Sequence, residues 1–130
     1  MEPSSYRILI VDDEPVIIAL LASFLSSQGY LCVTATNGRA ALEMATQNHF
    51  DVVITDVLMP EMDGITLTQE LLHQFPDLFI MVMTGYYDEK TMENAVAAGA
   101  HEFIKKPFSL AEFDMRFQRI IRESKHRKGL

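Results

Sequence analysis

The sequence predicts an α/β fold, in which a five-stranded parallel sheet in the order 2-1-3-4-5 carries helices on both faces. Short apolar runs rich in β-branched residues alternate with segments of helical periodicity, which is the pattern of successive βαβ units. The middle runs are apolar throughout, as is typical of strands covered on both faces. Right-handed crossovers leave few arrangements for such a sheet, and this strand order is a common one.

The first half of the chain contains three of the expected strands, at 7–11, 31–35 and 51–55. Between the first two strands, apolar residues recur at helical spacing and stop before Gly29, which we expect to end the first helix as a C-terminal cap. A weaker helical repeat at 40–45 separates the second strand from the third. Strands that are consecutive in the sequence are therefore joined by a helix.

The same alternation continues in the second half of the chain. A third helix begins near Gly64 and reaches Phe75, because Pro76 cannot continue it. The remaining elements are a strand at 79–83, a helix at 91–98 that ends at Gly99, a strand at 102–104, and a last helix with Ser109 as its N-cap.

Length and composition indicate one domain with one core, since the chain has 130 residues of which 48% are hydrophobic. No apolar run approaches the ~20 residues of a bilayer-spanning helix, and the first residues do not resemble a signal peptide. The single cysteine, Cys32, fits a reducing compartment. We therefore expect a cytoplasmic protein without membrane contact.

The net charge of −7 argues against direct binding of nucleic acid by this domain. The C-terminal end differs from the acidic body, because basic residues accumulate there. We expect an N-terminal tail at 1–6, a domain at 7–123 and a basic tail at 124–130. The basic tail is either the solvated end of the last helix or the stub of a linker to an absent output domain.

Polar residues follow the expected strands at their carboxyl ends. In open α/β sheets the functional crevice lies at these ends, where the strand order reverses, here between the first and third strands. The residues at these ends are Asp12, Asp13 and Glu14 after the first strand, Asp56 after the third, Thr84 after the fourth and Lys106 after the fifth.

The carboxylates of Asp12, Asp13 and Asp56 predict a Mg²⁺ site. Carboxylates in one crevice repel each other by about 4 kcal/mol per pair at ~4 Å, so a proton or a cation must share the site. Oxygen ligands select a hard ion, and Mg²⁺ binds few carboxylates together with phosphate oxygens. No His or Cys stands at these ends, which argues against zinc.

A carboxylate beside Mg²⁺ can act as a nucleophile toward phosphorus and form an aspartyl phosphate. Phosphoryl transfer depends on positioning and on neutralising the phosphoryl oxygens. Lys106 supplies a positive charge and Thr84 a hydroxyl group for that purpose. The hypothesis from these residues is that Asp56 accepts a phosphoryl group.

Five short segments of the chain form a specific set of motifs. They are Val-Asp-Asp-Glu at 11–14, Asp-Val-Leu-Met-Pro-Glu-Met-Asp-Gly at 56–64, Met-Thr-Gly at 83–85, Gly-Ala at 99–100 and Lys-Pro-Phe at 106–108. With these segments the sequence resembles the receiver domain of two-component response regulators from Arg7 to about Glu123. The resemblance implies a flavodoxin-like receiver fold with Asp56 as phosphoacceptor, and it implies no enzymatic activity other than catalysis of the domain's own phosphorylation and dephosphorylation.

The resemblance further implies a role for each site residue. Asp13 would bind Mg²⁺ directly, Asp12 directly or through water, and the backbone carbonyl of Leu58 would be a further ligand. Lys106 would pair with the phosphoryl oxygens, and the peptide bond between Lys106 and Pro107 would be cis.

The implied switch consists of Thr84, which would move to the phosphoryl group, and Phe103, which would turn inward. Their movement would alter the face formed by the fourth helix, the fifth strand and the fifth helix, through which a homodimer could form. The implied phosphodonor is a histidine kinase or a histidine phosphotransfer protein. Leu58 and Tyr86 could cover the phosphoryl group and slow its hydrolysis.

Two alternatives remain at the level of sequence. An aspartate-nucleophile phosphohydrolase normally has a second acid two residues after the nucleophile, where this chain has Leu58. A phosphate-independent interaction domain of the same fold would have little reason to retain Asp12, Asp13, Asp56, Thr84 and Lys106 together. A nucleotide-binding module is disfavoured, because the loop after the first strand has no glycine.

Overall fold

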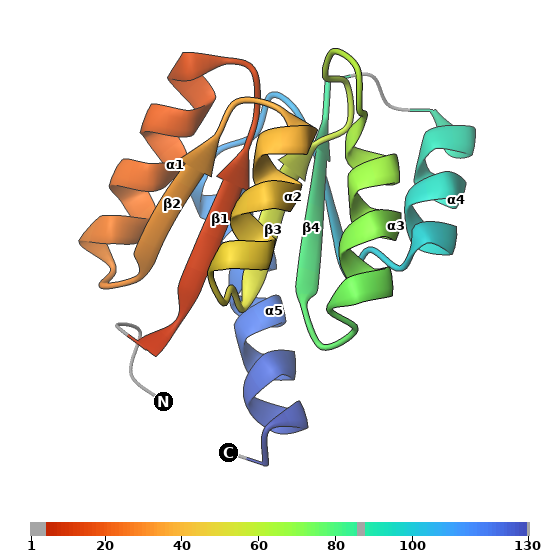
Figure 1. Cartoon of the computed structure of the whole chain (residues 1–130). Coiled ribbons are helices and arrows are strands. Elements are labelled where there is room, and N and C mark those ends of the chain that lie inside the picture. Colours follow the sequence, from red (N-terminus) through yellow and green to blue (C-terminus); the bar gives the residue numbers. More distant parts are fainter. Residues whose placement is uncertain (1–4, 86–87, 130) are drawn as a thin grey trace.

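Strands and helices alternate throughout residues 5–85 and 88–129, the part of the chain that the computed structural model describes (Figure 1). The strands are β1 (Arg7–Val11), β2 (Leu31–Ala35), β3 (Val52–Asp56), β4 (Phe79–Thr84) and β5 (Glu102–Lys105). The helices are α1 (Pro15–Ser27), α2 (Gly38–Gln47), α3 (Gly64–Gln74), α4 (Glu89–Ala98) and α5 (Leu110–Arg127).

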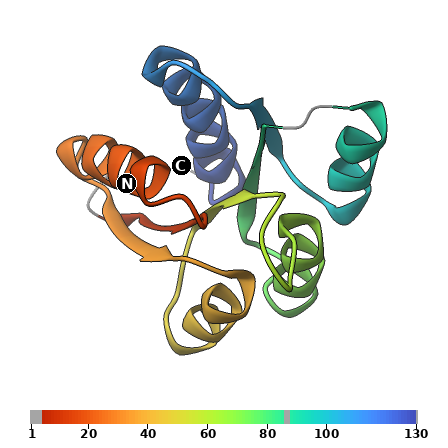
Figure 2. The same cartoon turned by 90° about the horizontal axis from the view of Figure 1, so that it is seen from above.

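The strands form one parallel sheet in the order β2-β1-β3-β4-β5, which confirms the predicted order. Seen from above, α1 and α5 lie on one face of the sheet, whereas α2, α3 and α4 lie on the other (Figure 2). The order reverses between β1 and β3, so the crevice expected at the carboxyl ends of these two strands exists in the topology. The fold class is therefore as predicted.

Two apolar clusters, one on each face, hold the helices to the sheet. Successive residues of β1 alternate between them, because side chains of a strand point to opposite faces. Ile8 and Ile10 pack with α1 and α5, whereas Leu9 and Val11 pack with α2, α3 and α4. All residues of β3 and β4 are buried, which explains why both strands are almost continuously apolar in the sequence.

The predicted helix ends coincide with capping contacts. Gly29 has φ 98°, a left-handed conformation that favours glycine, and the N–H of Tyr30 donates to the carbonyl of Leu25 at 3.1 Å. At the start of α5, Ser109 Oγ accepts a hydrogen bond from the N–H of Glu112 at 3.0 Å. These contacts stop α1 and begin α5 at the expected residues.

Residues of both expected tails pack against the rest of the domain. Tyr6, assigned to the N-terminal tail, is fully buried in the cluster between the sheet and α5. Residues 124–127, assigned to the basic tail, continue α5, and Ser124 is buried. The guanidinium carbon of Arg127 lies 4.4 Å from the centre of the Phe79 ring, which gives this basic end a packed position.

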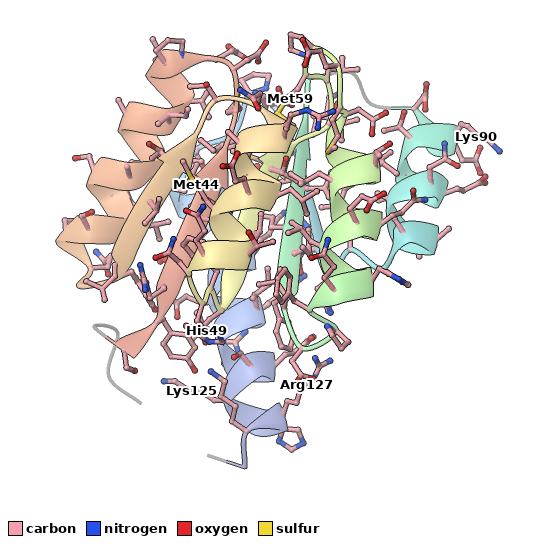
Figure 3. All side chains as sticks on the ribbon, viewed as in Figure 1. Met44, His49, Met59, Lys90, Lys125 and Arg127 are labelled. Atoms are coloured by element: carbon pink, nitrogen blue, oxygen red, sulfur yellow. The ribbon has the colours of Figure 1, made fainter. Side chains whose placement is uncertain are left out.

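The basic end of α5 lies at the amino ends of the strands. Figure 3 shows His49, Lys125 and Arg127 around the lower end of α5, whereas Met59 lies at the opposite end of the sheet. Within the described residues, no helix is long and apolar enough to cross a membrane.

Asp51 is a buried carboxylate at this lower end. Its Oδ2 accepts a hydrogen bond from the backbone N–H of Arg7 at 2.9 Å, and its Oδ1 lies 3.0 Å from Lys128 Nζ and 3.2 Å from His49 Nε2. Burial acts to raise the pKa of Asp51, but the contacts with Arg7, Lys128 and His49 outweigh burial and hold the pKa below its usual range. The ionised form is therefore the stabilised one.

Replacing Asp51 by asparagine is expected to lower the free energy of unfolding by about 1–2 kcal/mol at neutral pH, because the charge-assisted bonds are lost. A carboxyl group whose pKa is lower in the folded than in the unfolded protein stabilises the fold at pH values above its unfolded pKa, which is about 4. This stabilisation is lost as the pH falls through the folded pKa. The difference between wild type and Asp51→Asn should therefore shrink in acid. Urea unfolding at neutral and acidic pH measures it, and a difference independent of pH would contradict the account.

Candidate functional site

The acidic residues predicted from the strand ends converge at the carboxyl edge of the sheet. Asp12 and Asp13 directly follow β1, and Asp56 is the last residue of β3, the neighbouring strand. Ligand oxygens of the three carboxylates lie within 4.8 Å of one another. Asp12 and Asp56 are buried and Asp13 is exposed, so the cluster has a buried side and a side that faces solvent.

Lys106 reaches into the same cluster from the loop after β5. Its Nζ lies 2.8 Å from Asp12 Oδ2 and 3.4 Å from Asp56 Oδ2. Its backbone N–H donates to the carbonyl of Thr84 at 2.7 Å, which ties the lysine to the end of β4. The peptide bond between Lys106 and Pro107 is cis, as expected. The structure thus brings together the acidic residues and the lysine that the sequence predicted for this site.

Burial and the excess of acids over the single lysine together determine the electrostatics of the cluster. Burial, followed by the charge of Asp12, raises the pKa of Asp56 to about 6, although the Lys106 ammonium group opposes the shift. Burial acts to lower the pKa of Lys106, but hydrogen bonds to Asp12 and Glu14 outweigh it and raise the pKa above its usual range. Lys106 therefore stays charged, and the ionised form of Asp56 is less favoured than that of an exposed aspartate.

The donor atoms of the cluster fit Mg²⁺. Asp12, Asp13 and Asp56 supply oxygen ligands, which hard cations prefer. The exposed position of Asp13 leaves one side open for water or phosphate oxygens, as Mg²⁺ requires. A cation there would supply the positive charge that the excess of carboxylates calls for.

Of the expected switch residues, Thr84 lies at the carboxyl edge of the sheet, where the acidic residues converge, and Phe103 lies on β5, the strand next to β4. Thr84 is fully buried at the carboxyl end of β4, beside β3. The Phe103 side chain is partly buried and packs against the apolar cluster between the sheet and α2, α3 and α4. Leu58 is 60% exposed in the loop after Asp56. The expected cover from Tyr86 lies outside the described residues.

Two residues have contacts at the site that the sequence did not assign to them. Glu14 Oε1 lies 2.9 Å from Lys106 Nζ, in a pair that joins residues far apart in the sequence. A Cβ atom on Gly64 would overlap the backbone carbonyl of Asp56, so only glycine allows the start of α3 to approach β3 this closely. Directly before Gly64, Asp63 caps α3, because its Oδ1 accepts a hydrogen bond from the N–H of Thr66 at 2.7 Å.

Comparisons with known proteins agree with this architecture. The family model for the response regulator receiver domain matches residues 8–118. Among solved structures, the receiver domain of NtrC4 is 34% identical and superposes with a TM-score of 0.86 over 91% of this chain and 98% of that chain. The response regulator TrrA of Thermotoga maritima is 33% identical, with a TM-score of 0.80 over 88% of this chain and 98% of that chain.

Curated relatives are longer proteins. The regulatory protein AtoC of Escherichia coli is 37% identical over 95% of this chain, which spans 27% of AtoC. The transcriptional regulatory protein PhoP of Bacillus subtilis is 35% identical over 91% of this chain, which spans 49% of PhoP. With the family model covering most of the chain and the topology in agreement, the chain belongs to the family of response regulator receiver domains.

Proposed function

We propose that Asp56 accepts a phosphoryl group in a Mg²⁺-dependent reaction and thereby switches the surface of the domain. The observation that carries the proposal is the convergence of Asp56 with Asp12, Asp13 and Lys106 in one half-buried crevice. Membership of a family in which phosphoryl acceptance on aspartate is standard supports it. The TrrA structure is described as a complex with Mg²⁺ and a beryllium fluoride, which supports the choice of ion.

In the proposed reaction an Asp56 carboxylate oxygen attacks the phosphorus of the donor. The bond from phosphorus to the leaving group breaks, and the leaving group takes the electron pair. Asp12, Asp13, Asp56 and the Leu58 carbonyl would hold Mg²⁺, which supplies charge compensation for the phosphoryl oxygens. Lys106 would pair with one of these oxygens. The domain would catalyse only its own phosphorylation and dephosphorylation.

The proposed donor is a histidine kinase or a histidine phosphotransfer protein. Exposed apolar residues around the crevice support a protein donor: Val16 and Leu20 lie on α1, directly after the acidic loop, and Leu58 follows Asp56. Exposed apolar residues are common on surfaces that bind another protein. A phosphohydrolase is less well supported, because Leu58 leaves no general acid two residues after Asp56.

The proposed output surface consists of α4, β5 and α5. Thr84 and Phe103 would transmit the phosphorylation of Asp56 to it, and Val96 and Met115 expose apolar side chains there. The beryllofluoride-activated NtrC4 receiver domain is described as a dimer. We infer that this surface can join two copies of the activated chain.

Incubation with Mg²⁺ and acetyl phosphate is expected to add one phosphoryl group to the wild type, detected by intact mass. The Asp56→Asn variant should stay unmodified, and chelation of Mg²⁺ should prevent the reaction in the wild type. Asp77→Asn is the matched control, because Asp77 is exposed in the loop before β4. An adduct on Asp56→Asn would refute Asp56 as the acceptor and place the phosphoryl group on another residue. No adduct on the wild type would refute the proposal in favour of a phosphate-independent interaction domain.

The exposed Leu58 side chain is expected to prolong the life of the phosphoryl group, because apolar bulk beside it hinders an attacking water. Leu58→Asn should increase the rate of spontaneous dephosphorylation by about tenfold, which corresponds to about 1.4 kcal/mol of barrier. Loss of the mass adduct over time measures this rate. Leu31→Asn, which changes an exposed leucine on β2, serves as control, and equal rates in both variants would count against a shielding role.

Activation with Mg²⁺ and beryllofluoride is expected to promote self-association through α4, β5 and α5. Val96→Glu places a charge on this surface and should weaken the association by about tenfold or more. Sedimentation velocity over a concentration series provides the measurement. Val16→Glu is the control on α1, and an equal loss in both variants would contradict an interface specific to α4, β5 and α5, because the effect would then arise from the added charge.

A further inference from the structure

Glu14 lies in the turn between β1 and α1, and the proposed phosphoryl chemistry assigns it no role. It is the N-cap residue of α1, with extended backbone angles of φ −96° and ψ 111°, but its side chain caps no helical N–H. N-cap residues usually direct a short polar side chain back onto the helix. The Glu14 carboxylate points across the crevice instead, where Oε1 lies 2.9 Å from Lys106 Nζ.

Lys106 has unequal contacts with the carboxylates around it. Nζ lies 2.8 Å from Asp12 Oδ2 and 2.9 Å from Glu14 Oε1, distances typical of charge-assisted hydrogen bonds. Its distance to Asp56 Oδ2 is 3.4 Å. An ammonium group has three N–H donors, so Glu14 takes one that the oxygens of a phosphoryl group on Asp56 could use.

The two short contacts differ in how easily they can be broken. The Asp12 side chain is fully buried, whereas the Glu14 side chain is 59% exposed. Water and salt screen a charge pair with an exposed partner much more than a buried pair. The backbone bond from Lys106 to Thr84 holds the lysine in the crevice independently of Glu14. The ion pair between Lys106 and Asp12 is thus the more stable one, and the ion pair between Lys106 and Glu14 is the one that breaks more easily.

We propose that Glu14 is a positioning residue, which occupies one N–H donor of the Lys106 ammonium group until a phosphoryl group arrives on Asp56. This inference rests on the proposed function. When Asp56 Oδ bonds to phosphorus, the negative charge beside Lys106 increases and new acceptor oxygens appear. Lys106 then exchanges the exposed Glu14 carboxylate for a phosphoryl oxygen. No proton is transferred, and the bond to Asp12 remains.

Glu14→Gln should increase the rate of phosphorylation by acetyl phosphate with Mg²⁺ about two- to fivefold at low ionic strength, the range for breaking an exposed ion pair. The increase should diminish at high salt. The matched control is Glu61→Gln, because Glu61 is an exposed acid in the loop after β3, at the same end of the sheet. Its rate should remain close to that of the wild type.

Nitrogen NMR of the lysine side chains gives a readout that does not depend on the reaction rate. Glu14→Gln should shift the Lys106 Nζ resonance in the unphosphorylated protein, whereas the resonances of variant and wild type should converge once beryllofluoride and Mg²⁺ are bound. Glu61→Gln should shift neither. A persistent difference in the bound state would overturn the exchange of partners.

The outcomes separate this inference from the function on which it rests. A wild type that takes no phosphoryl group refutes the proposed function. A wild type that is phosphorylated at the same rate as Glu14→Gln, or faster, overturns the positioning role alone. Equal acceleration in Glu14→Gln and Glu61→Gln also overturns it, because the effect would then arise from net charge.

Discussion

The compensation of buried negative charge by Lys106 is the interaction on which the site depends. Asp12 is fully buried and Asp56 nearly so, and an unpaired carboxylate in such a position would cost several kcal/mol. Lys106 reaches both from the far edge of the sheet, since β5 is the last strand in the order. One cation among several acids leaves the crevice short of positive charge, and this deficit is the physical basis of the proposed binding of Mg²⁺.

The elements that the sequence predicted correctly are those specified by local patterns. Buried parallel strands require apolar runs, and each run in this chain ends where a polar residue meets the carboxyl edge of the sheet. Asp56 was therefore recognisable, although the predicted third strand began one residue early, at Asp51. The side chain of Asp51 accepts a hydrogen bond from the N–H of Arg7 beside the sheet. A periodic pattern cannot distinguish such a residue from a strand residue.

The contacts that the sequence did not reveal join residues distant along the chain. Glu14 and Lys106 are separated by 92 positions, and Asp51 and Lys128 by 77. Each of these residues is charged and stands in a loop or near a helix end, where charge is ordinary, so nothing local marks the pairing. Only the folded topology, which brings the segments flanking α5 beside the loops around β1 and β3, makes them partners.

These long-range pairs also explain why α5 is suited to respond to the site. Lys106 precedes α5 and binds Asp12 at the carboxyl edge of the sheet, whereas Lys128 follows α5 and binds Asp51 at the amino edge. The helix is thus tied at both ends to buried carboxylates. A phosphoryl group changes the charge at only one of these ends. In the proposed switch, an adjustment of Lys106 would act on the start of a helix whose other end remains fixed, and the change would be directed toward β5 and the adjoining surface of α5.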